Sequence, residues 1–198
     1  MTDDEDLYRA DDGAMVLSAG DREALIPTWV VTRDDLNRAE RDNIAAGRRW
    51  ARRRAFDVLD PDELMALHKR MFGAVWRWAG EPRRVETNIG RPDWWRLREY
   101  LQQLLGNIHA QVEAGGRDAD EVAIDFHHQL VAIHVFPNGN GRHGRLAADI
   151  LAVRLGREPF SWGRSDLVAV GDARISYRAA LKAADAGDLA PLFAFARS

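Results

Sequence analysis

One stretch of the sequence places a histidine, a glycine-rich turn and two arginines close together. It reads HVFPNGNGRHGR from His134 to Arg145. Glycine takes positive φ without a Cβ penalty, so Gly139 and Gly141 allow the backbone N–H groups around Asn140 to converge on an anion. The turn therefore favours a phosphate site.

The residues after the turn carry apolar side chains at Leu146, Ile150 and Val153, which is helical spacing. The turn would then open a helix N-terminus, where the macrodipole favours negative charge. Arg142 and Arg145 lie on one face of the first turn, and two planar guanidiniums suit a polyphosphate. The glycines alone fit an ordinary helix-to-helix turn equally well, but such a turn needs neither the histidine nor the arginines.

Composition narrows the classes of function. The chain has 198 residues, a formal net charge of -3 and no cysteine. A net negative charge argues against direct nucleic-acid binding, and the lack of cysteine excludes disulfides and thiolate metal sites. No apolar run reaches the length of a membrane span, and the acidic start is unlike a signal peptide, so we expect a cytoplasmic protein without a membrane partner.

The remaining elements predict a helical chain. Residues 1–24 form an acidic segment with little periodicity, and residues 25–198 are expected to form one domain. Bounded by turn formers, residues 83–90 are predicted to form a short hairpin. Helices are expected over about 34–55, 61–72, 93–113, 118–133, 142–155, 171–185 and 188–196.

The central stretch resembles the signature of the Fic/Doc family, His-x-Phe-x-Asp/Glu-Gly-Asn-Gly-Arg-x-x-Arg, and departs from it only at Asn138. The segments WRWAGEPRRVETNIG and EVAIDFHHQLVAIH also resemble that family, and the span from LIPTWV to the C-terminus resembles its mobile mystery protein B subgroup. The resemblance implies an all-α, Fic-type helical bundle with a small β-hairpin flap and an N-terminal helix packed on the core.

The resemblance also implies a protein adenylyltransferase that moves AMP from ATP to a Ser, Thr or Tyr hydroxyl of a target protein. His134 would be the general base, and Phe136 would be buried and hold the loop. Asn140, with the N–H groups of Gly139 and Gly141, would cradle the α-phosphate. Arg142 and Arg145 would hold the β- and γ-phosphates. The hairpin would align the target by strand addition through Arg84, Val85, Glu86, Thr87, Asn88 and Ile89.

Asn138 stands where the family has an acidic ligand of Mg²⁺. An amide oxygen coordinates without contributing charge, so we expect weak Mg²⁺ binding. Two alternatives to adenylyl transfer follow: a nucleotide-binding regulator with little catalysis, half of a toxin-antitoxin-like pair, and a Doc-like phosphotransferase. His127, His128, His134 and His143 lack the spacing of a transition-metal site.

Regulation is suggested by Glu40, on the expected N-terminal helix. In many Fic proteins an inhibitory glutamate pairs with the second arginine of the motif, so the resemblance suggests that Glu40 restrains Arg145. The residues around Glu40 depart from the inhibitory pattern at Leu36 and Arg41. The alternative is a solvated helix glutamate. A regulatory partner or antitoxin is the corresponding expectation for binding partners.

Overall fold

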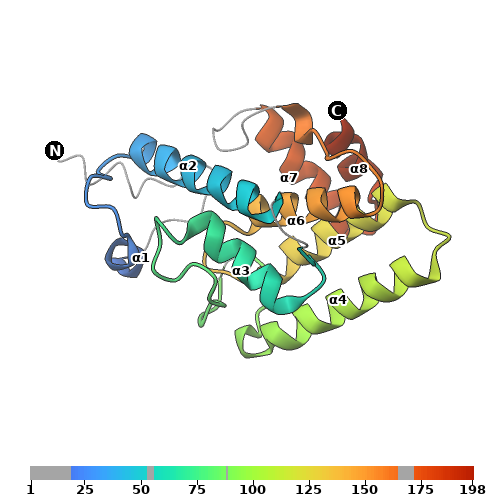
Figure 1. The fold of residues 1–198 in the computed structure, drawn as a ribbon, viewed down its shortest axis with the longest axis horizontal. Helices are drawn as coiled ribbons and strands as arrows, with labels where there is room; N and C mark the ends of the chain where they lie inside the picture. Colours follow the sequence, from blue (N-terminus) through green and yellow to red (C-terminus); the bar gives the residue numbers. More distant parts are fainter. Residues whose placement is uncertain (1–18, 53–55, 88, 165–171) are drawn as a thin grey trace. The chain divides into compact units, whose positions relative to one another are not determined.

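A computed structural model describes residues 19–52, 56–87, 89–164 and 172–198 (Figure 1). The described residues are helical and contain no strand; an isolated antiparallel bridge joins Leu25 to Trp76. This confirms the all-α class. The α-helices are α1 (Ala19–Ala24), α2 (Arg33–Arg52), α3 (Pro61–Phe72), α4 (Leu97–Ala114), α5 (Ala119–Ile133), α6 (Asn140–Arg154), α7 (Asp172–Asp185) and α8 (Ala190–Arg197), with 3₁₀ turns η2 (Trp94–Arg96) and η3 (Trp162–Arg164).

Two compact units make up the chain: Met1–Phe56 with Met65–Glu81, and Asp57–Leu64 with Pro82–Ser198. In the first unit, Thr32 and Asp35 cap α2 reciprocally, because Thr32 Oγ1 accepts from Asp35 N at 3.1 Å and Asp35 Oδ2 accepts from Thr32 N at 3.2 Å. Gly47 allows close helix contact, since a Cβ there would lie 2.8 Å from Met71 Cγ.

The second unit is built around α5, which packs against α4, α6 and α8 (Figure 1). Asp118 caps α5, since its Oδ1 accepts the N–H of Asp120 at 2.8 Å. Phe126, Ala147, Leu151 and Leu192 are fully buried. Asp188 Oδ1 accepts from Ala190 N at 3.1 Å, and Leu189 is the N-cap of α8.

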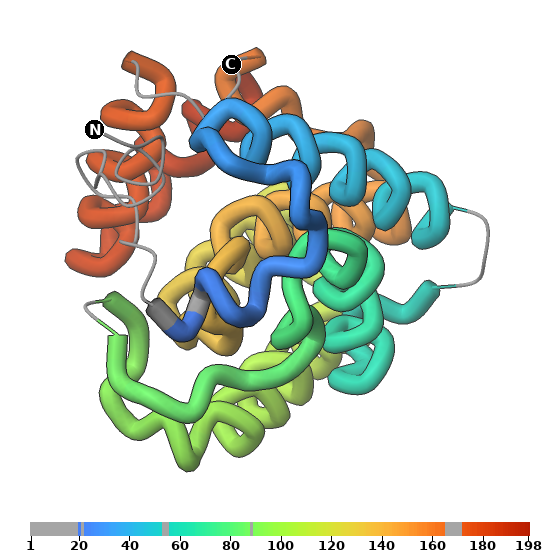
Figure 2. Tube along the Cα trace, turned by 90° about the vertical axis from the view of Figure 1, so that its left-hand side faces the viewer, coloured from blue at the N-terminus to red at the C-terminus, as the bar shows by residue number. Residues whose placement is uncertain are grey.

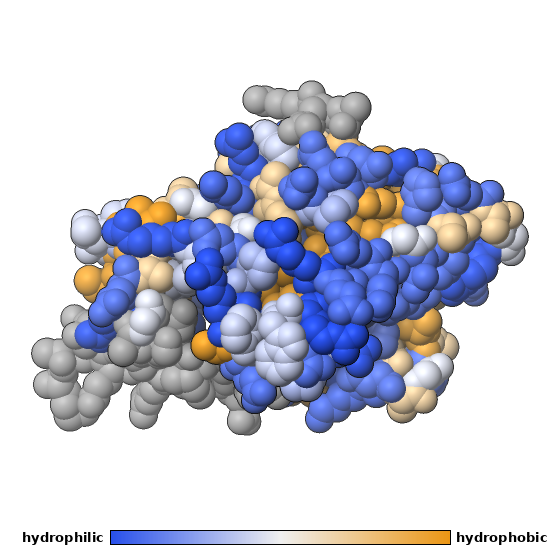
Figure 3. All heavy atoms as spheres, turned by 90° about the horizontal axis from the view of Figure 1, so that it is seen from below, coloured by the Kyte–Doolittle hydropathy of each residue, from blue (hydrophilic) through white to orange (hydrophobic). Residues whose placement is uncertain are grey.

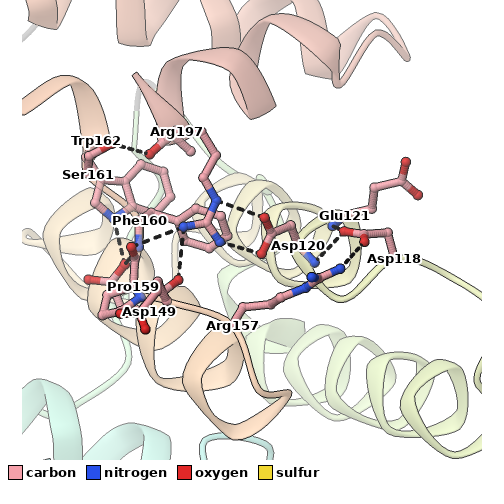
Figure 4. A network of polar contacts seen from close by, with 12 residues as sticks. Asp118, Asp120, Glu121, Asp149, Arg157, Pro159, Phe160, Ser161, Trp162 and Arg197 are labelled. Atoms are coloured by element: carbon pink, nitrogen blue, oxygen red, sulfur yellow. Dashed lines mark hydrogen bonds and ion pairs between the residues drawn. The ribbon is translucent and has the colours of Figure 1, made fainter.

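A polar network fixes the end of the chain within the second unit (Figure 4). Arg197 forks onto the Asp120 carboxylate, with Nε 2.8 Å from Oδ2, and its guanidinium lies 4.1 Å from the centre of the Phe160 ring. Asp149 Oδ1 accepts from Phe160 N at 3.1 Å and from Trp162 Nε1 at 2.9 Å. The network sets Trp162 against His127, with ring centres 4.6 Å apart.

The predicted hairpin takes another form. Figure 2 traces its segment in green, and the described residues of 83–90 are a loop without strand pairing; Asn88 lies outside the described residues. The guanidinium of Arg83 binds the carbonyls of Val85 and Arg91, at the two ends of the loop.

Exposed apolar side chains form separate patches between polar ones on the face in Figure 3. The neighbouring side chains of Trp94 and Trp95 are 37% and 64% exposed. Within the described part of the chain, no helix combines the length and hydropathy that a membrane span requires.

Candidate active site

His134 is the C-cap of α5 and has left-handed backbone geometry, with φ 56° and ψ 60°. A non-glycine residue in this region is strained, and such strain clusters at functional sites. The side chain is 6% exposed, and neither ring nitrogen has a hydrogen-bond partner. A buried imidazole with both nitrogens unsatisfied is costly unless a ligand completes it.

Burial, and then the charge of Arg83, lower the pKa of His134 to about 4. The Val131 carbonyl opposes this slightly but makes no hydrogen bond of normal geometry with the ring. The imidazole is therefore neutral near pH 7 and can accept a proton.

The turn after His134 is held by the side chain of Asn140. Its Oδ1 accepts from Phe136 N at 3.0 Å, and its Nδ2 donates to Phe136 O at 2.7 Å. Both polar atoms of the amide thus bind backbone, so its contribution to anion binding would come through its own N–H. Phe136 is buried, as the resemblance implied.

The glycines of the turn lie at the start of α6, which begins at Asn140 and not at about residue 142 as predicted. Gly139 is the N-cap with φ 80°, and the first helical bond runs from His143 N to Gly139 O at 2.9 Å. The N–H groups of Asn140 and Gly141 therefore have no partner within the helix. Gly139 N donates to Asn138 Oδ1 at 2.6 Å. An anion site at this end would thus use the first helical amides and the macrodipole.

Both signature arginines lie in the second unit and are partly buried. The guanidinium of Arg145 lies 5.2 Å from the centre of the Tyr177 ring. Burial lowers the pKa of Arg145, which the nearby Tyr177 partly opposes. Tyr177 OH lies 3.0 Å from His127 Nε2, so α5 and α7 both support Arg145. No sequence pattern predicts this support of Arg145 by Tyr177.

Another residue that the sequence did not single out is Arg83. Its side chain is 2% exposed and donates from Nε to His134 O at 2.7 Å and from Nη1 to Val85 O at 2.7 Å. Gly90 has φ 93°, and a Cβ there would lie 2.3 Å from His134 Cβ. The described residues 84–87 and 89 thus belong to a loop that closes against the candidate base.

The other histidines are core residues or surface residues. His143 is 1% exposed, and its Nε2 lies 3.0 Å from Leu64 O. His68 is a satisfied core histidine, since its Nδ1 accepts from Gly80 N at 3.0 Å. His128 pairs with Asp185 at 2.8 Å.

Glu40 is 4% exposed, so the alternative of a solvated glutamate is wrong. Its Oε1 accepts from Trp76 Nε1 at 2.8 Å within the first unit. The indole thereby anchors the carboxylate.

A protein-held Mg²⁺ site does not fit these residues. Asn138 offers only an amide oxygen, which already accepts from Gly139 N. The described residues contain no group of three or more His, Cys, Asp or Glu side chains that could hold a metal ion. Mg²⁺ prefers carboxylate and water oxygens, so any ion here would depend on the nucleotide and water for its ligands.

Comparisons with known proteins identify relatives of this chain. Residues 58–152 match the model of the Fic/DOC family. The protein adenylyltransferase fic-1 of Caenorhabditis elegans is 28% identical over 141 residues, which are 68% of this chain and 26% of that protein. This chain thus spans about a quarter of the length of that relative.

Solved structures share the fold. A part of C. elegans Fic-1 has a TM-score of 0.68 at 24% identity and covers 91% of this chain and 54% of that one. BepC of Bartonella tribocorum, solved with bound AMPPNP, has a TM-score of 0.65 at 17% identity, covering 91% and 97%. Residues 58–152, which include His134 and the turn that follows it, thus form a region of the Fic/DOC family.

Proposed function

We propose that this protein is a protein adenylyltransferase that transfers AMP from ATP to a hydroxyl side chain of a target protein. The observation that carries the proposal is the buried, neutral His134, whose two ring nitrogens are unsatisfied and which precedes the N-terminus of α6, at Asn140, by six residues. Relatives named protein adenylyltransferases support the same activity.

In the proposed reaction, the target hydroxyl oxygen attacks the α-phosphorus of ATP. A new P–O bond forms, the bond to the β-phosphate bridging oxygen breaks, and pyrophosphate leaves. One ring nitrogen of His134 takes the hydroxyl proton. The pKa of about 4 describes the free protein, and the negative triphosphate would raise it toward the working range.

The nucleotide would lie against the N-terminus of α6. The amides of Asn140 and Gly141 would meet the α-phosphate as charge builds there, and Arg142 and Arg145 would hold the outer phosphates. The BepC structure with bound AMPPNP supports a nucleotide as the ligand of this fold. Because the side chain of Asn140 binds Phe136, its role is to shape the turn.

The target segment would bind the loop at Arg84–Ile89 through main-chain hydrogen bonds. The loop would take its hairpin conformation when the target strand is added. Val85 and Ile89, which lie within this stretch, have exposed side chains. Backbone pairing selects register, so the hydroxyl would be presented to His134 by position and not by side-chain type.

Incubation with ATP labelled at the α-phosphate, Mg²⁺ or Mn²⁺ and a cell lysate should label target proteins. The label should disappear in His134→Ala, while calorimetry shows ATP still bound. His128→Ala is the matched control, since His128 lies on the same helix outside the site. Undiminished labelling of target proteins by His134→Ala would refute the assignment of His134 as the general base.

A second candidate, a nucleotide-binding regulator with little catalysis, is favoured by Asn138. An aspartate there would add a charged ligand for Mg²⁺, so Asn138→Asp should strengthen metal-dependent ATP binding and raise transfer. ATP binding without transfer, unimproved by Asn138→Asp, would favour the regulator. Transfer of the γ-phosphate in place of AMP would favour the Doc-like phosphotransferase.

We also propose that Glu40 restrains Arg145. Glu40→Gly would remove both the charge and the acceptor of Trp76, so Glu40→Gln is the sharper test because its amide oxygen can still accept from the indole. Restraint predicts stronger ATP binding and more automodification in both variants. If neither variant changes them, Glu40 acts only in packing.

A further inference from the structure

Arg83 is a buried guanidinium that donates hydrogen bonds to three backbone carbonyls. It binds His134 O at 2.7 Å through Nε, Val85 O at 2.7 Å through Nη1 and Arg91 O through Nη2. Burial lowers its pKa, which the charge of Glu86 partly opposes. A planar fork can serve three such acceptors together, whereas an ammonium cannot reproduce this geometry.

The backbone around Arg83 completes the same junction. Arg83 N donates to Val135 O at 2.9 Å, and Arg91 N donates to Ile133 O at 3.5 Å. Both ends of the 83–91 loop are therefore bonded to the three residues centred on His134. The close approach of Gly90 to His134 Cβ brings the two backbones together at a third point.

The left-handed conformation of His134 is part of this arrangement. The αL conformation is strained for a histidine and persists only where its surroundings hold it. The carbonyl of His134 accepts the charged Nε–H of Arg83, which is a stronger bond than a neutral one.

We propose that Arg83 is a positioning residue that couples the target-docking loop to the catalytic base. Its guanidinium fixes both ends of the loop and the carbonyl of His134 together, so that a target strand aligned on the loop is in register with the imidazole. The inference rests on the proposed function for the roles of His134 and the loop. Arg83 touches neither substrate nor reacting atoms in this arrangement.

The test compares Arg83→Lys, which keeps the charge but loses the fork, with Arg83→Gln, which loses both. The control is Arg98→Gln, an exposed arginine on α4 outside the site. Hydrogen exchange should quicken on the order of tenfold or more over 84–91 and 133–135 in both Arg83 variants, because charged hydrogen bonds are lost. NMR of labelled histidine should show the His134 pKa raised in Arg83→Gln and close to wild type in Arg83→Lys.

In the transfer assay, Arg83→Lys should raise KM for the target and lower kcat, while the Kd for ATP stays within about twofold, because Arg83 does not touch the α6 N-terminus. Unchanged hydrogen exchange over 84–91 in Arg83→Lys would overturn the proposal. A loss of ATP affinity as large as the loss of transfer would also overturn it, because it indicates general damage to the site. If the wild-type protein transfers no AMP, the proposed function fails. Hydrogen exchange and the pKa of His134 still test whether Arg83 couples the loop to His134. Should Arg83→Gln not fold, Arg83→Lys carries the test.

Discussion

Acidification should destabilise this protein through three buried histidines. Burial lowers the pKa of His127 to about 3 and the pKa values of His134 and His143 to about 4, from an ordinary value of 6.5. The unfolded chain takes up a proton at each site below pH about 6.5, whereas the native protein stays neutral there. The unfolded state thus binds more protons between pH about 6.5 and about 4, so the free energy of unfolding falls as pH falls.

The magnitude follows from the same values. At pH about 5, about 1.5 units below the unfolded pKa, each histidine costs about 2 kcal/mol, and the three together cost roughly 6 kcal/mol. The lowered pKa values of Asp35, Glu99 and Asp118 act in a separate window, because their stabilisation is lost only as pH falls below the ordinary carboxyl range.

Urea unfolding followed by circular dichroism between pH about 7 and about 5 measures this dependence. We expect a slope near pH 5 that corresponds to roughly three protons. His127→Phe should lower the slope by about one proton, whereas His109→Gln, at an exposed site, should leave it unchanged. A free energy of unfolding that stays level over this range would refute the argument from burial.

Three further perturbations test single contacts. Gly90→Ala should lower transfer at least about tenfold with ATP affinity kept, because its Cβ would meet His134 Cβ at 2.3 Å; transfer at the wild-type rate would contradict the close approach. Arg197→Ala should lower the free energy of unfolding by roughly 2–4 kcal/mol, since it breaks the two hydrogen bonds to the Asp120 carboxylate. A loss below about 0.5 kcal/mol would show that the ion pair is as weak as an exposed surface ion pair. Tyr177→Phe should weaken ATP binding a few-fold in calorimetry, because the hydroxyl that supports Arg145 and His127 is lost; unchanged binding would separate Tyr177 from the phosphate site.

The helices were predictable because their caps and breakers are local signals. In the structure Asp60 lies before α3, Asp118 before α5 and Gly139 before α6, and only α6 begins two residues earlier than predicted. The loop at 83–91 was not predictable, because it depends on hydrogen bonds from the Arg83 guanidinium to the carbonyls of Arg91 and His134. Hydropathy and turn propensity do not indicate such bonds. The burial of His143 is likewise a tertiary effect, since its partner is Leu64 O.

The candidate site was predictable as a contiguous motif and not as a set of contacts. The spacing located His134, the turn and both arginines, whereas the bond between Asn140 and Phe136 and the support of Arg145 by Tyr177 depend on folding. The cytoplasmic location, the likeness to the mobile mystery protein B subgroup and the single domain over residues 25–198 stay predictions.

Mass spectrometry of target proteins after incubation with a mixture of nucleotides tests the central claim most directly. The proposed function predicts an added AMP on a Ser, Thr or Tyr hydroxyl with the wild-type protein, and no adduct with His134→Ala. An added phosphate group in place of AMP, or an AMP adduct formed equally well by His134→Ala, would contradict it.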